Sequence, residues 1–302
     1  MKNYLLFTFI TLTLLVSCKK DNNDTPEPSQ LYRIIKMEYI FPADSLTSEY
    51  LYTYEDEKLI HIRSESSRVY FVSYLNYVTN DQIDVLDSIM ENSEPVVYEG
   101  SYFLQNGLIT QITFTYIHPS NTTYTYSDGQ LIECVTYNAS QEADSKKVYT
   151  YQNEKLATYE EYDYSDDKGA WELWLRNEYT WYGDELKQIL NYLAMFEPSD
   201  FKLRTKWEFV LQGNVPVKAT SYSLDNSDEW QKYSEFFFSY NPEGYLEEVR
   251  EEVTVNGSSV VYFILSLQYE KGESNMNMFN KTTPEKGVFG DYLPPQFMIS
   301  YF

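Results

Sequence analysis

The sequence is poor in the residues that carry most enzyme and metal chemistry. Of its 302 residues, only Cys18 and Cys134 are cysteines and only His61 and His118 are histidines. The two histidines lie far apart and outside any metal-ligand spacing, which argues against zinc and against histidine-based catalysis. The sequence also lacks the glycine-rich phosphate-binding motifs. We therefore predict no catalytic residue, no metal site and no cofactor.

Positive charge is also scarce. Lysine and arginine together number 23 against 46 aspartates and glutamates, which gives a formal net charge of -23. Phosphate backbones and anionic lipid surfaces repel such a chain, so we expect no nucleic-acid partner. Two carboxylates could serve a glycoside hydrolase. Because chance pairs are common among 46 acidic residues, this carboxylate-dependent hydrolase remains only an alternative to a non-enzymatic protein.

Only one apolar run is long enough to suggest targeting. Residues 5–16 follow Lys2 and have the length of a secretion signal, which is short for a bilayer span. The run ends in Leu15-Val16-Ser17-Cys18, which resembles the lipobox of bacterial lipoproteins. That resemblance implies cleavage before Cys18 and acylation of its thiol and new amino group. An ordinary signal peptide or membrane anchor with a chance cysteine is the alternative.

The residues after the lipobox indicate the domain organisation. Residues 19–30, KKDNNDTPEPSQ, contain no apolar side chain and read as a solvated tether. Their first residues resemble the charged signal that places Bacteroidota lipoproteins on the outer face of the outer membrane. We predict a signal peptide at 1–17, an acylated cysteine and tether at 18–30, and one domain at 31–302 that is less regular from about 270. The lipid would be the contact with the membrane, and Cys134 is expected to be a buried small apolar residue.

Aromatic residues are abundant, and they recur in a pattern. The chain has 31 tyrosines, 17 phenylalanines and 5 tryptophans. In strings such as YTYSDGQLIECV (residues 124–135), an aromatic strand end is followed by a polar turn and an aliphatic anchor. The anchors are Leu59, Ile83, Leu108, Leu131, Leu156, Leu186, Val217 and Leu246, with steps of 24, 25, 23, 25, 30, 31 and 29 residues. Such regular steps indicate an internal repeat.

Each repeat is predicted to be a β-hairpin. Its strands are rich in aromatic and β-branched residues, and Asn106-Gly107 and Asp128-Gly129 are strong signals for two-residue turns with positive φ. Tandem hairpins give an antiparallel meander of about 17 strands. The strand near residues 82–90 is doubtful because Ile83, Leu86 and Ile89 are also spaced like one face of a short helix.

The expected fold class is all-β, in one long, twisted and curled open sheet. Adjacent strands rotate by roughly 20–25°, so a sheet of this size cannot stay flat. A closed soluble barrel is the alternative. A transmembrane barrel is disfavoured because segments such as residues 246–255, LEEVREEVTV, carry charges on both alternating sets of side chains.

The repeated string resembles the YD repeats of Rhs-type bacterial proteins and teneurins. Tyr126, Gly129 and Leu131 match that pattern, but most copies here lack the glycine and the units are longer. The resemblance implies local hairpin geometry and not encapsulation of a toxin. Lipobox and YD-like hairpins together resemble a group of Bacteroidota surface lipoproteins, and that resemblance implies an envelope location and no particular activity.

We expect a non-catalytic surface lipoprotein that binds a glycan or a protein. Aromatic rows on a sheet can stack against sugars, and Trp171, Trp174 and Trp230 are the candidate stacking residues. A structural or assembly partner of an outer-membrane protein is the alternative. The strings Asp-Ser-Leu and Asp-Ser-Ile resemble Bacteroidota O-glycosylation signals. That resemblance implies that Ser45 and Ser88 carry glycans.

Overall fold

A computed structural model describes residues 32–42, 46–66, 70–91, 94–115, 120–194, 197–212, 215–225, 228–255, 257–272, 281–282 and 284. These residues form strands, apart from turns and a short 3-10 helix, η2 (Pro198–Asp200). The strands are β1 (Tyr32–Phe41), β2 (Leu46–Glu55), β3 (Lys58–Ser66), β4 (Tyr70–Thr79), β5 (Gln82–Glu91), β6 (Glu94–Gln105), β7 (Leu108–Phe114), β8 (Ser120–Ser127), β9 (Gln130–Tyr137), β10 (Ala143–Gln152), β11 (Lys155–Ser165), β12 (Ala170–Tyr182), β13 (Glu185–Leu193), β14 (Lys202–Gln212), β15 (Val215–Leu224), β16 (Trp230–Tyr240), β17 (Leu246–Val255) and β18 (Ser258–Lys271).

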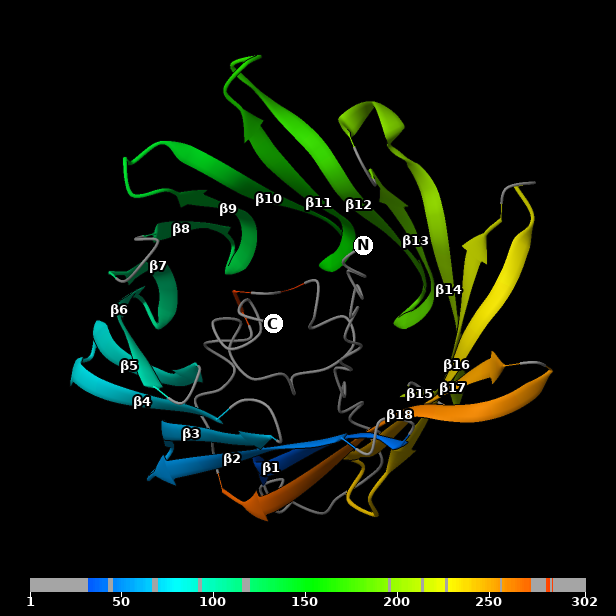
Figure 1. The fold of residues 1–302 in the computed structure, drawn as a ribbon, viewed down its shortest axis with the longest axis horizontal. Coiled ribbons are helices and arrows are strands. Elements are labelled where there is room, and N and C mark those ends of the chain that lie inside the picture. The colour runs from blue at the N-terminus through cyan, green and yellow to red at the C-terminus, as the bar shows by residue number, and fades with distance from the viewer. Residues whose placement is uncertain are drawn as a thin grey trace, which may run out of the picture.

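The 18 strands close into one antiparallel barrel (Figure 1). Each strand pairs with the next one along the chain, and β18 pairs with β1 from Tyr32↔Lys271 to Ile40↔Ile264. The all-β, antiparallel part of the expectation agrees with the structure, but the open curled sheet is wrong. Closure is favoured because it pairs the backbone N–H and C=O groups that the free edges of β1 and β18 would leave without partners.

The doubtful segment near residue 82 is a strand and not a helix. Strand β5 pairs with β4 and β6 along its whole length. Ile83 and Val85 lie on its buried face, whereas Leu86 is on the exposed face. The apolar residues at helical spacing therefore belong to opposite faces of an extended chain, because side chains alternate with a period of two in a strand.

The inner face of the barrel carries the apolar core. One alternating set of side chains is buried around the ring, including Met37, Ile62 and Ile109, each 0% exposed. The other set carries most of the ion pairs and most of the partly exposed residues, although the Lys147–Glu161 pair lies on the same face as Tyr149 and Tyr159. Because the outer side of a single closed sheet faces solvent, the buried set points inward. The barrel is therefore apolar inside and charged outside.

The repeated tyrosine ties each hairpin to the one before it. Seven aromatic residues at the ends of even-numbered strands donate a hydrogen bond to the anchor carbonyl of the preceding strand. The pairs are Tyr54–Ile34, Tyr77–Leu59, Tyr126–Ile109, Tyr151–Leu131, Trp181–Leu156, Tyr240–Pro216 and Tyr269–Leu246, at 2.6–2.9 Å. We call this ring of residues the collar. Leu104 and Leu211 hold the corresponding positions in β6 and β14 and pack against the same core.

A β-bulge beside each collar residue sets the register. The pairing shifts, for example, between Thr125 and Tyr126 and between Thr150 and Tyr151. Such bulges turn a side chain out of the regular alternation, which here carries the ring toward the neighbouring hairpin. Two anchors were misplaced by one residue in the sequence alignment: Ile109 and Pro216, rather than Leu108 and Val217, are the buried ones.

The turns at the collar end are the predicted tight ones. Asp128 and Gly129 have φ angles of 51° and 78°, and Asn106 and Gly107 repeat this geometry, which confirms the predicted turns. The connections at the opposite end are longer, and Figure 1 shows several of them pointing outward from the ring, as between β11 and β12. Within the described residues, no helix has the length and hydropathy needed to cross a membrane.

Candidate functional site

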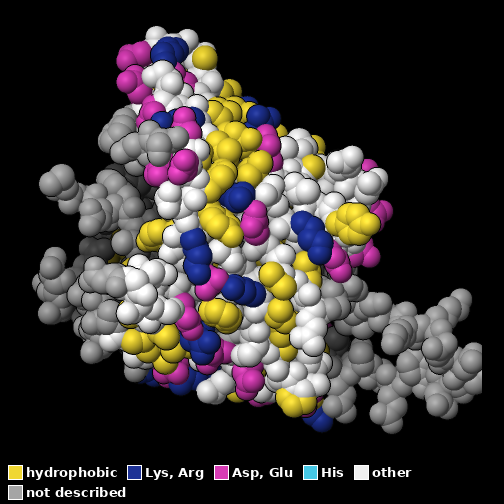
Figure 2. All heavy atoms as spheres, turned by 90° about the vertical axis from the view of Figure 1, so that its right-hand side faces the viewer, with side chains coloured by type: hydrophobic (Ala, Val, Ile, Leu, Met, Phe, Trp, Pro, Cys, Tyr) yellow, Lys and Arg dark blue, Asp and Glu magenta, His cyan; other side chains and the backbone are white. Residues whose placement is uncertain are grey.

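The outer face of the barrel is built for contact with water. Figure 2 shows basic and acidic side chains scattered among small hydrophobic patches on the side that lies at the right of Figure 1. Ion pairs occur well within the strands, as in Lys206–Glu208 at 2.8 Å and Arg250–Glu252 at 3.1 Å. A lysine or arginine facing lipid at the bilayer midplane costs about 2–4 kcal/mol. The outer face is therefore unsuited to a lipid environment.

Aromatic side chains gather on this outer face near the longer loops. In the first cluster, Lys146 of β10 lies over two rings, 4.9 Å from the centroid of Tyr162 and 4.8 Å from that of Trp171. Trp171 also meets Tyr164 edge to face, with centroids 5.2 Å apart. The register places Lys146 opposite Tyr162 and Tyr164 opposite Trp171, so three neighbouring strands build the cluster.

A second cluster follows on the next hairpin. Tyr192 of β13 stacks on Phe201, with centroids 6.1 Å apart and planes at 16°. Arg176 lies opposite Tyr192 in the register and pairs with Glu160 at 3.0 Å. The Tyr192 hydroxyl donates to Glu178 at 3.3 Å. Burial and the nearby Glu178 raise the pKa of Tyr192, so this hydroxyl keeps its proton and remains a donor.

The third cluster repeats the first one. Lys206 of β14 lies 4.6 Å from the ring centroid of Tyr222 and 5.0 Å from that of Trp230. The basic residues 146, 176 and 206 are 30 residues apart, as are the tyrosines 162, 192 and 222. Each repeat thus places one cation and two rings at the same height of the barrel. We give the name outer aromatic row to the following residues: Lys146, Tyr162, Trp171, Arg176, Tyr192, Phe201, Lys206, Tyr222 and Trp230.

Proton transfer is not a property of this row. Burial, followed by the hydrogen bond to Glu160, raises the pKa of Tyr162 to about 12. The hydroxyl therefore stays neutral at physiological pH. The row offers ring faces, ring edges and hydrogen-bonding groups, which suit recognition of a polar ligand with apolar C–H faces.

Two of the three predicted stacking tryptophans lie in the outer aromatic row, and the third lies outside it. Trp171 and Trp230 lie in equivalent positions of the outer aromatic row. Trp174 lies at a bulge in β12, and its indole N–H is buried without a hydrogen bond within the described part of the chain. The tyrosines and basic residues of the row were missed by the sequence analysis, although their 30-residue spacing was available as a signal.

The other predicted site residues lie apart from the row. Ser88 is in the middle of β5, opposite Val72 and Val97, and its modification stays a prediction. Cys18 and Ser45 lie outside the described residues, so lipidation and glycosylation there also stay predictions. Cys134 is buried, as predicted, and forms no disulfide within the described residues. His61 stacks on Tyr74, with centroids 4.8 Å apart, and burial lowers its pKa.

No metal-binding group of side chains occurs among the residues that the structure describes. The acidic loop between β11 and β12 is a turn in which Gly169 has a φ of 60° and Lys168 pairs with Glu172. The lysine therefore neutralises one of the carboxylates that a calcium ion would need.

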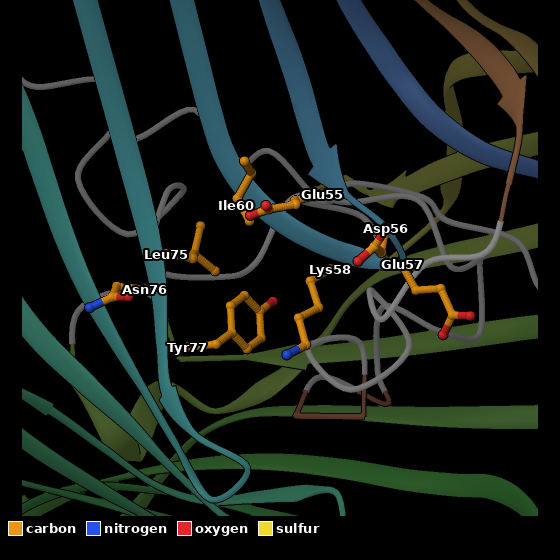
Figure 3. A pocket seen from close by; sticks show the side chains of 8 residues that line it. All are labelled: Glu55, Asp56, Glu57, Lys58, Ile60, Leu75, Asn76 and Tyr77. Carbon is orange, nitrogen blue, oxygen red and sulfur yellow. The ribbon is translucent and has the colours of Figure 1, made fainter.

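A shallow pocket of about 530 Å³ opens at the collar end, beside the turn between β2 and β3 (Figure 3). In Figure 3, Lys58 directs its amino group toward Tyr77, at 4.9 Å from the ring centroid, while Glu57 points away. The Tyr77 hydroxyl is already bonded to the Leu59 carbonyl. This pocket therefore lies between the collar residue Tyr77 and the charged turn at residues 55–58.

Comparisons with known proteins gave matches among solved structures alone. No protein-family profile and no curated protein matches the chain. The solved structures that match include a porin-like protein from Bacteroides uniformis, with 12% identity and a TM-score of 0.44, over 78% of this chain and 98% of that one. A Bacteroides fragilis protein of unknown function matches with 17% identity and a TM-score of 0.34, over 42% of this chain and 94% of that one.

Proposed function

We propose that this protein is a non-catalytic binding protein of the bacterial outer membrane, anchored by lipid on Cys18 and resembling Bacteroidota surface lipoproteins. Its ligand would be a polysaccharide that lies along the outer aromatic row. The observation that supports this function is the recurrence of a basic residue and two aromatic rings on three consecutive hairpins, with the cation over the rings in the first and third clusters and ring stacking in the second. A repeating polymer is the natural ligand for a surface with repeating sites, because each further site adds to the avidity.

The chemistry of the row suits sugars. Pyranose rings have apolar C–H faces that stack on aromatic rings and hydroxyl groups that need polar partners. Trp171 and Trp230 supply the largest rings, and Glu178 and Glu208 supply carboxylates beside Tyr192 and Lys206 of the same row. Sites of this kind bind weakly one at a time. Affinity would therefore depend on the ligand spanning several clusters.

The test is electrophoresis of the purified protein through native gels that contain neutral polysaccharides, followed by titration with the polymer that retards it. Trp171→Ala combined with Trp230→Ala should weaken binding by at least tenfold. The matched control is Tyr182→Ala, because Tyr182 is exposed on the same strand as Trp171 but lies at the collar end. Equal binding by the double variant and by the control would refute the assignment of the row.

The anchor is tested separately. A Cys18→Ala variant should lose incorporation of labelled palmitate and should leave the membrane fraction. If it still sediments with membranes, the lipid is not the anchor. Recovery of the detergent-extracted protein in a fixed ratio with one membrane protein would instead favour the assembly role over glycan binding.

A further inference from the structure

The width of the barrel raises the question of what shields its inner face. In closed sheets of 16–18 strands, the wall side chains are too short to fill the interior. Nevertheless, inward-pointing rings six residues away from the collar positions of their strands are shielded from water: Tyr98 is 6% exposed and Phe263 is 6% exposed. The Tyr52 hydroxyl, at the tip of another inward ring, is also buried. The wall is therefore covered from the side of the barrel axis.

The chain that follows the last strand returns to this interior. Strand β18 ends at Lys271 at the collar end, and Thr282 lies 11 residues further along the chain. Thr282 is 6% exposed. In Figure 1, the short red segment that contains it lies inside the ring of strands. The described residues 281–282 therefore lie inside the ring, close in sequence to residues 285–302.

The composition of the remaining chain matches an apolar inner wall. Residues 285–302 carry only three charged side chains: Glu285, Lys286 and Asp291. They include nine aliphatic or aromatic side chains: Val288, Phe289, Tyr292, Leu293, Phe297, Met298, Ile299, Tyr301 and Phe302. The pair Pro294-Pro295 disfavours an additional strand in the sheet. Residues 19–30, in contrast, contain no apolar side chain that could use such a surface.

The inner wall also carries a buried acid whose hydrogen bonding is incomplete. The Asp87 carboxyl is buried, and the nearby Ser73 hydroxyl has a single proton, which cannot satisfy both carboxyl oxygens. The two residues face each other across β4 and β5. Leaving such groups without partners costs about 1–3 kcal/mol each. Backbone amides of a peptide that lies against this part of the wall would supply the missing partners.

We propose that the inner face of the barrel is a docking surface for residues 285–302 of the same chain. The apolar residues of that segment cover the inward rings, and the barrel is a filled body and not an open channel. This assignment accounts for the apolar interior and the charged exterior, which are the reverse of the arrangement in a membrane channel.

The first test measures how fast a maleimide reagent modifies a single thiol. The protein used starts at Lys19 and has Cys134 replaced by Ser, so that an introduced cysteine is its only thiol. Gln296→Cys places the thiol in the C-terminal segment at a polar position, and Ser29→Cys places it in the polar tether. We expect a maleimide reagent to modify Gln296→Cys at least tenfold more slowly than Ser29→Cys under native conditions, and equally fast in denaturant. Equal native rates would overturn the proposal.

The second test asks whether the segment lies inside the barrel or elsewhere. Removing residues 285–302 should speed modification of the native Cys134, which points inward, by at least tenfold. The control is Val135→Cys in a chain with Cys134 replaced by Ser, which places the thiol on the outer face of the same strand. Its modification rate should change by less than twofold when residues 285–302 are removed. An unchanged Cys134 rate in the folded, shortened chain would place the segment outside and overturn the proposal. If the shortened chain unfolds, the proposal is decided by the first test, which compares the native modification rates of Gln296→Cys and Ser29→Cys.

Discussion

Asp87 should make the stability of the barrel depend on pH. Its side chain is 0% exposed on the inner face of β5, with Ser73 opposite on β4. Burial raises the pKa of the Asp87 carboxyl from 3.8 to about 7, and the nearby Ser73 hydroxyl opposes this shift only in part. The perturbation we propose is Asp87→Asn, which keeps the shape of the side chain and removes its titration.

The magnitude follows from proton linkage. Because the carboxyl binds its proton more tightly in the folded state, it stabilises the fold at low pH, and this contribution is lost as the pH rises through about 7. With about 1.4 kcal/mol per pKa unit, the contribution falls by about 3 kcal/mol between pH 4.5 and pH 8. Between pH 4.5 and pH 8, the free energy of unfolding of Asp87→Asn should therefore rise by about 3 kcal/mol relative to that of the wild type.

The assay is urea unfolding of both proteins at pH 4.5 and at pH 8, with the free energies of unfolding compared at each pH. Burial also raises the pKa values of Asp163 and Glu251, but these groups are present in both proteins and cancel in the difference. Asp84→Asn is the control. Asp84 lies on the outer face of β5, where it accepts hydrogen bonds from Gln82 and Ser101 at 2.8 Å, so its substitution should not give a gain at pH 8.

A constant difference between Asp87→Asn and the wild type at the two pH values would refute the reasoning. It would mean that the Asp87 carboxyl reaches water or a cation in the folded protein. An equal gain for Asp84→Asn would show that the effect comes from net charge. With a formal net charge of -23, general repulsion is the main competing cause.

Three further predictions concern the repeat. Tyr151→Phe should cost about 1 kcal/mol in urea unfolding, because it removes the hydrogen bond to the Leu131 carbonyl, whereas Tyr182→Phe at an exposed ring should cost nothing measurable. Leu131→Ala should cost about 2–5 kcal/mol by the same assay, and a smaller loss would contradict its place in the core. Gly100→Ala should lower the melting temperature, because a Cβ there would lie 2.7 Å from the Phe114 ring; an unchanged temperature would show that the ring can move aside.

Local features of the fold were readable from the sequence because they depend on neighbouring residues. Asp128-Gly129 specifies a turn with two positive φ angles, and the flanking aromatic and β-branched residues favour strands. Leu131 was placed correctly as a buried anchor. The anchors at Ile109 and Pro216 were missed by one residue, because a bulge changes the alternation without leaving a sequence signal of its own.

The candidate site was readable only in part. Trp171 and Trp230 were singled out because they are large aromatic residues at equivalent repeat positions. Their partners Lys146 and Lys206 come from strands two places earlier, and contact with them depends on the cross-strand register. Trp174 was grouped with them, although the bulge in β12 gives it different surroundings. Composition alone does not distinguish these cases.

By itself, the sequence determined a chain of antiparallel hairpins with buried aliphatic anchors and aromatic strand ends. Only the tertiary structure decided that the sheet closes, because Tyr32 and Lys271 meet across more than 200 residues and no local pattern records that pairing. Closure in turn decided which face is the inside. Once one set of side chains is crowded on the concave face, Asp87 becomes a buried acid, and the outer aromatic row is left facing solvent.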